Sequence, residues 1–126
     1  MRMKRLIIAF ALSMTAAYAH AGLLRYECSF VFVCTEFGDC GSSDFELNFM
    51  IDTVTGEAKT VGNNGFSDVY LVSGYNSISL IEPLPTGAVQ TTTIIENGHA
   101  LHSRHTVIAG TFTNSQYHGS CGRTGQ

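Results

Sequence analysis

Histidine, serine and arginine side chains that could do chemistry gather near the C-terminal end of this 126-residue chain. The segment 99–105 is His-Ala-Leu-His-Ser-Arg-His, and a further histidine lies close behind it. Imidazoles bind transition metals and act as general bases, while a guanidinium binds carboxylates and other anions. We therefore take four of these side chains as candidate binding residues: His102, Arg104, His105 and His118.

A β-strand over this segment would keep the candidate metal ligands apart. Side chains alternate between the two faces of a strand, so His99 and His105 share a face and His102 points to the other. At about 3.3 Å per residue, His99 and His105 would stand roughly 20 Å apart. A metal site would need His102 or His105 to meet His118 or an acid from a neighbouring strand. We predict no metal site and interpret the segment as polar residues on the solvent side of a hairpin.

Ser103 and His105 would lie on the same face of that strand, with Arg104 between them pointing away. Same-face neighbours on a strand seldom reach hydrogen-bonding distance, and a serine nucleophile also needs an oriented base and an oxyanion hole. The chain has no G-x-S-x-G turn and no Gly-rich phosphate loop, and its scattered acids define no catalytic pair. We therefore predict a protein that is not an enzyme and uses no cofactor. A small hydrolase or metal-binding protein built on residues 99–105 is the second alternative.

The start of the chain has the pattern of a secretory signal peptide. Three basic residues among the first five precede an apolar run over 6–17, and Ala-His-Ala follows at 19–21. The run is too short for a membrane-spanning helix, and the small residues form a cleavage site. We expect residues 1–21 to be removed. Residues 22–126 would then form a single exported domain, periplasmic or extracellular, with no membrane anchor.

The expected domain is small and acidic. It has 105 residues and keeps four of the seven basic residues and all ten acidic ones, so its formal charge is −6 instead of −3. A chain of this length is too short for a multidomain protein. The absence of a basic cluster argues against nucleic acid and anionic membranes as partners. The expected partner is an unknown protein or small ligand, and a basic surface would complement the charge.

Four cysteines in a short exported chain indicate two disulfides. Cys28 and Cys34 fall in one predicted strand, which places their Cα atoms roughly 20 Å apart, whereas a disulfide needs about 4.4–6.8 Å. We favour Cys34–Cys40, which closes a small loop, together with Cys28–Cys121, which ties the first strand to the C-terminal segment. The crossed pairing of Cys28 with Cys40 and Cys34 with Cys121 stays open. The spacing does not match a zinc site.

Alternating apolar and polar residues between turn signals predict an all-β fold. On the first strand the side chains of Tyr26, Cys28, Phe30, Phe32 and Cys34 would share a face. Turn residues such as Asn97-Gly98 separate the segments, and no strongly amphipathic helix is present. A small antiparallel meander of about seven or eight strands, closed as a barrel or a two-sheet sandwich, would bury the apolar faces. The predicted strands cover 26–34, 45–52, 57–61, 66–73, 75–82, 88–96, a return strand from near 99, and about 107–114.

Three short motifs resemble the C-type lysozyme inhibitors of bacterial envelopes: Tyr26-Glu27-Cys28, Ser73-Gly74-Tyr75 and Cys121. Members of that family are small exported β-barrels that open with Tyr-x-Cys and end on a cysteine. Their Ser-Gly-x-x-basic-Tyr loop enters the lysozyme cleft. Here Tyr75 follows Gly74 directly, the basic residue is missing, and Cys34–Cys40 has no expected counterpart. The resemblance implies inhibition of an extracellular or host hydrolase.

These patterns together lead to one expected function and its alternatives. The absence of catalytic motifs and a rigid disulfide-linked scaffold with free loops favour a non-catalytic module that binds a ligand or a protein. Inhibition of a hydrolase is the first alternative to this expectation.

Overall fold

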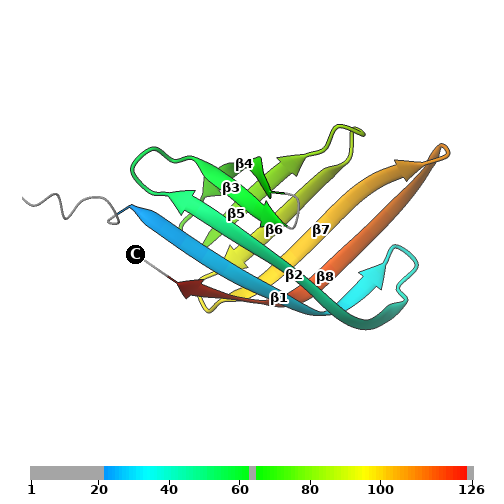
Figure 1. Ribbon diagram of the computed structural model, residues 1–126. Coiled ribbons are helices and arrows are strands. Elements are labelled where there is room, and N and C mark those ends of the chain that lie inside the picture. Colours follow the sequence, from blue (N-terminus) through cyan, green and yellow to red (C-terminus); the bar gives the residue numbers. More distant parts are fainter. Residues whose placement is uncertain (1–21, 63–64, 125–126) are drawn as a thin grey trace, which may run out of the picture.

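The protein is a closed eight-stranded antiparallel barrel in which each strand pairs with the next and β1 also pairs with β8 (Figure 1). This computed structural model describes residues 22–62 and 65–124, so the expected signal peptide lies outside it. The predicted all-β meander is confirmed, and the closure is a barrel and not a sandwich. The strands are β1 (Leu23–Thr35), β2 (Cys40–Asp52), β3 (Ala58–Gly62), β4 (Gly65–Ser73), β5 (Ser77–Pro83), β6 (Val89–Ile95), β7 (His99–Ile108) and β8 (Thr111–Thr124).

The up-and-down order gives the barrel two distinct ends. The start of β1, the end of β8 and the turns 53–57, 74–76 and 96–98 lie at one end, on the left in Figure 1, which we call the terminal mouth. The turns 36–39, 84–88 and 109–110 lie at the other end, which we call the opposite mouth. Within the described residues, no helix is long and apolar enough to cross a membrane.

The barrel interior is filled by the apolar face of each strand. On β2, Phe49 and Ile51 are buried and Phe45 and Leu47 pack against them, as the predicted alternation requires. Leu80 from β5 and other buried side chains complete the core. An eight-stranded barrel leaves an interior just wide enough for side chains, so strict alternation is sufficient to fill it.

A β-bulge in β1 corrects the predicted face of the first strand. The register with both β2 and β8 shifts between Phe30 and Phe32, and Val31 is the additional residue opposite β8. Phe30 is buried, whereas Val31 and Phe32 are both exposed. The bulge reverses the alternation, so Phe32 and Cys34 leave the face that Cys28 and Phe30 share. The alternation of apolar and polar residues along the strand does not reveal a bulge of this kind, so the sequence did not predict it.

Both favoured disulfides are present. Cys28–Cys121 joins β1 to β8 inside the barrel, where both cysteines belong to the core. Cys34–Cys40 closes the β1–β2 turn, in which the Thr35 N–H donates to the Asp39 carbonyl oxygen at 2.8 Å. The crossed pairing is thereby excluded.

The C-terminal strands differ from the prediction. The expected strand at 107–114 is the tip of a hairpin, because β7 continues to Ile108 and β8 begins at Thr111. The two residues between them, Ala109 and Gly110, have φ values of 51° and 77°. Two-residue hairpin turns often need positive φ at both positions, which usually requires Asn or Gly. The sequence did not predict this turn because its first position is an alanine, Ala109, and not Asn or Gly. The strand expected from 75 also starts later, at Ser77.

Candidate functional site

The four candidate binding residues do not form one site. Strand β7 alternates as expected, so His102 is 2% exposed inside the barrel while His105 is exposed on the outer wall. Arg104 shares the inner face by register and is exposed at the opposite mouth. His118 lies on the outer face of β8, where its ring stacks on Phe32 with centroids 4.5 Å apart. Burial of His102 also corrects the interpretation of segment 99–105 as polar residues on the solvent side of a hairpin, because the face opposite to His99 and His105 is the barrel interior.

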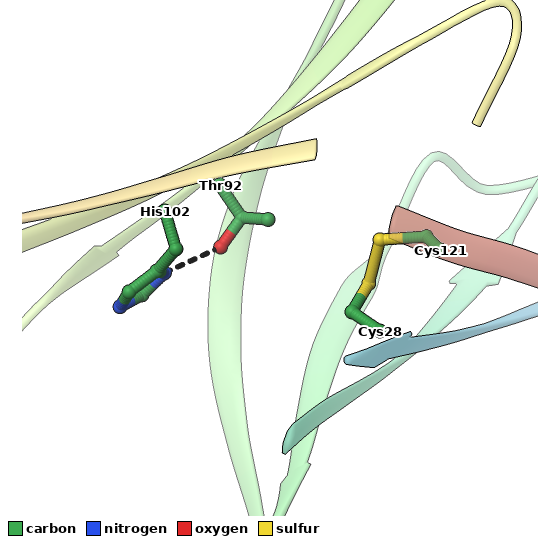
Figure 2. The surroundings of a disulfide bond; sticks show 4 residues. All are labelled: Cys28, Thr92, His102 and Cys121. Atoms are coloured by element: carbon green, nitrogen blue, oxygen red, sulfur yellow. Dashed lines mark hydrogen bonds between the residues drawn. A yellow bond between two sulfur atoms is a disulfide. The ribbon is translucent and has the colours of Figure 1, made fainter. Parts of the chain in front are cut away.

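His102 is held by hydrogen bonds at both ring nitrogens. Its Nδ1 lies 2.7 Å from Thr92 Oγ1, and its Nε2 lies 3.1 Å from Gln90 Oε1. The amide oxygen of Gln90 can only accept, so Nε2 carries the proton and Nδ1 accepts from the Thr92 hydroxyl. Figure 2 shows the imidazole turned toward Thr92, with the Cys28–Cys121 disulfide on the other side of Thr92 in this view.

Aromatic rings and one more polar contact enclose this pair. The ring centroids of Phe30, Phe45 and Tyr117 lie 5.4–5.8 Å from that of His102. Gln90 continues the hydrogen-bonded chain outward, because its Nε2 lies 3.5 Å from Glu82 Oε2. The arrangement satisfies a polar group within an apolar interior, as buried polar groups require.

Burial lowers the pKa of His102 to about 4, and the nearby positive charge of Arg104 acts in the same direction. A cationic imidazole would lose its hydration among the aromatic rings, and no carboxylate of the described residues contacts it to compensate. His102 is therefore neutral at physiological pH.

The lowered pKa predicts that acid destabilises the fold before carboxylates protonate. Above pH 6.5 His102 is neutral in both folded and unfolded chains and contributes no pH dependence. Between pH 6.5 and about 4 the unfolded chain binds a proton that the folded barrel does not, so this group removes about 1.4 kcal/mol of stability per pH unit, roughly 3 kcal/mol in all. Urea unfolding measured at half-unit steps of pH checks this.

Two comparisons separate His102 from other titrating groups. His102→Gln should flatten the dependence between pH 6.5 and 4, whereas His105→Gln, on the exposed outer wall, should leave it unchanged. Nuclear magnetic resonance titration of the wild-type protein should find the His102 ring neutral down to about pH 4. Protonation of that ring near pH 6.5 in the folded protein would contradict the prediction.

The outer histidines line two separate hollows. His105 lines one with Glu36 and residues of β1 and β8, and His118 lines another with His99, Val31 and Phe32. Among residues 22–62 and 65–124, no group of three His, Cys, Asp or Glu side chains could hold a metal ion. His99 and His118 therefore give two imidazoles at most on this face.

A larger hollow at the terminal mouth was missed by sequence analysis. It measures about 490 Å³ and is bordered by turns 74–76 and 96–98 and by the end of β8. That volume is in the range of small-ligand sites, which often lie in the mouths of β-barrels. Tyr75, at the tip of the β4–β5 turn, lines it and is fully exposed.

Backbone hydrogen bonds hold the rim of this hollow together. The Glu96 N–H donates to the Asn76 carbonyl oxygen at 3.0 Å, and the Cys121 N–H donates to that of Gly98 at 2.8 Å. The two turns and β8 are therefore fixed relative to one another before any ligand binds. The turn residues Gly74 and Asn97-Gly98 were visible in the sequence, but their proximity depends on barrel closure.

No protein-family model, curated protein or solved structure matches this chain.

Proposed function

We propose that the protein is a non-catalytic binding domain that works outside the cytoplasm and recognises its ligand or partner with the terminal mouth. The observation that carries this proposal is the hollow of about 490 Å³ with the fully exposed Tyr75 on its rim. Two disulfides are compatible with an oxidising environment, and the signal-peptide pattern of residues 1–21 supports export.

The surroundings of the histidines support a role without catalysis. Thr92 and His102 form a hydroxyl–imidazole pair of the type that could activate a nucleophile. Both residues are only 2% exposed, so a substrate carbonyl has no path to the hydroxyl. Ser103 and His105 lie on the outer face of β7, and no side-chain hydrogen bond joins them in the part of the chain that the structure describes.

A fragment screen by nuclear magnetic resonance tests the proposed binding site. Uniformly ¹⁵N-labelled protein would be titrated with a library of small apolar acids, amines and sugars at millimolar concentration. Fragments that bind should shift the amide signals of residues 74–77 and 96–98, which line the hollow. Binding confined to the outer wall or to the opposite mouth would contradict the proposal, as would a screen without binders.

Inhibition of a basic extracellular hydrolase is the second candidate, and the position of Tyr75 favours it. The Gly74 N–H donates to the Ser77 carbonyl oxygen at 2.8 Å, which makes the turn rigid and leaves the Tyr75 ring free to enter a cleft. Rigid, exposed aromatic side chains are frequent hot spots of binding. The formal charge of −6 in the expected domain would draw it toward a basic enzyme.

A C-type lysozyme at low salt provides the direct test of that candidate. We expect saturable inhibition that weakens as salt rises, and Tyr75→Ala should raise the inhibition constant by more than about tenfold. Tyr70→Ala is the matched control, because Tyr70 is also exposed but lies within β4, away from the turn. No inhibition at low salt, or equal effects of the two variants, would contradict this candidate.

A further inference from the structure

The few basic residues of this acidic protein are not distributed evenly over its surface. In the expected domain Lys59 pairs with Asp68 at 2.9 Å on the outer wall. Arg25 is paired in register with Thr124 and lies on the outer face of β1. Arg123 is paired with Tyr26, two residues before the inward-facing pair of Cys28 and Cys121 on β1. Because side chains alternate along a strand, Arg123 also faces the barrel interior, at the terminal mouth. Arg104 shares the inner face of β7 but lies at the opposite mouth, so register places one inward-facing cation, Arg123, at the terminal mouth.

A carboxylate shares the rim of the same hollow with Arg123. Glu96 lines it from the β6–β7 turn, and Arg123 lines it from β8. In the described part of the chain the only ion pair is Lys59–Asp68, so Glu96 and Arg123 share the hollow without contacting each other. Two opposite charges that lie on one rim and do not neutralise each other can each bind a complementary group of a ligand.

Apolar side chains form the floor between these charges. Ile94 is 4% exposed and belongs to the core, and Tyr26 and Ile78 pack against that core from β1 and β5. Asn76 and Asn97 also line the rim. The combination of an apolar floor with a few oriented polar groups is typical of small-molecule sites.

We propose that the terminal mouth binds small zwitterions that carry an apolar side chain, either free amino acids or short peptides with free termini. The guanidinium of Arg123 binds the ligand carboxylate, which it can do in a bidentate manner. The Glu96 carboxylate accepts hydrogen bonds from the ligand ammonium, and the apolar side chain covers Ile78 and Ile94. This ligand class rests on the proposed role of the terminal mouth as the binding surface.

Isothermal titration calorimetry with leucine and trileucine tests the proposal. We expect trileucine with free termini to bind, and free leucine distinguishes an amino-acid site from a peptide site. Amidation of the trileucine carboxyl group should weaken binding about tenfold, and acetylation of its amino group should do the same, because each removes one charge-assisted contact.

Two variants of the protein assign each charge to its partner. In Arg123→Gln the amidated and free peptides should bind equally, and in Glu96→Gln the acetylated and free peptides should bind equally. Arg25→Gln is the matched control, since Arg25 lies near the same end of the barrel but on its outer face, and it should keep both tenfold differences. All three side chains are exposed, so the variants should retain the unfolding midpoint of the wild type.

The outcomes separate this inference from the proposed function. The zwitterion proposal would be overturned if neither trileucine nor leucine binds. It would also be overturned if the affinity of trileucine is unchanged by amidation and by acetylation. If fragments without both charges still bind at residues 74–77 and 96–98, the terminal mouth remains the binding surface and only the ligand class is wrong. Equal loss in Arg25→Gln would also overturn the proposal, because a general effect of charge would then explain the data.

Discussion

Replacing Cys28 and Cys121 together by alanine is expected to lower the free energy of unfolding by about 4–5 kcal/mol, the largest effect of any disulfide change in this protein. The bond links residues 93 positions apart, and removing it releases the unfolded chain from a long closed loop. Alanine leaves no polar atom behind in the core, where Cys28 is 2% exposed. A domain of this size has little stability in reserve, so the variant should be largely unfolded near 37 °C.

The second disulfide is the matched control for the first. Cys34 and Cys40 are six positions apart and lie at a turn, so their replacement by alanine should cost only about 2 kcal/mol. Urea unfolding at neutral pH, followed by circular dichroism, measures both double variants under the same conditions. A Cys28/Cys121 variant no less stable than the Cys34/Cys40 variant would contradict the loop argument.

Gly119→Ala should destabilise the barrel by roughly 3 kcal/mol or more, since a methyl group at this position has no space. A Cβ atom there would overlap the Ser29 carbonyl oxygen and lie 2.6 Å from Phe30 Cα. Both are backbone atoms of β1, so the clash can be relieved only by separating β1 from β8. Those two strands close the barrel, next to the bulge between Phe30 and Phe32.

Gly122 provides a control on the same strand. A Cβ at Gly122 has no neighbour within 4 Å, so Gly122→Ala should change the free energy of unfolding by less than about 0.5 kcal/mol. Equal stabilities of the two variants in urea unfolding would show that β1 can move away from β8 at little cost.

Much of the fold was predictable because β-strands carry their pattern locally. Alternation along Phe45, Leu47, Phe49 and Ile51 predicted β2 from residue 45 onward and its buried face, although β2 already begins at Cys40. An extended strand cannot bring Cys28 to Cys34, which excludes one of the three cysteine pairings, whereas only the folded chain decides between the other two. The β7–β8 turn was missed because Ala109 adopts a positive φ that sequence statistics assign to other residues.

The candidate site was less predictable than the fold. Spacing alone shows that His102 faces away from His99 and His105, but not that it faces the core and bonds to Thr92 and Gln90. These partners belong to β6, which a hairpin brings alongside β7. The hollow at the terminal mouth is lined by residues that are far apart in the sequence, among them Tyr26, Asn76, Glu96 and Arg123.

Local side-chain chemistry was therefore sufficient for most of the strands and turns and for the exclusion of a Cys28–Cys34 disulfide, because each depends on neighbours in the chain or on the reach of an extended backbone. Barrel closure, the bulge at Val31, the neutral buried His102 and the charged rim of Arg123 and Glu96 required the folded chain. Each of these depends on which strand lies beside which and in what register. A shift of β8 by one residue in register would have turned Arg123 from the mouth to the outer wall.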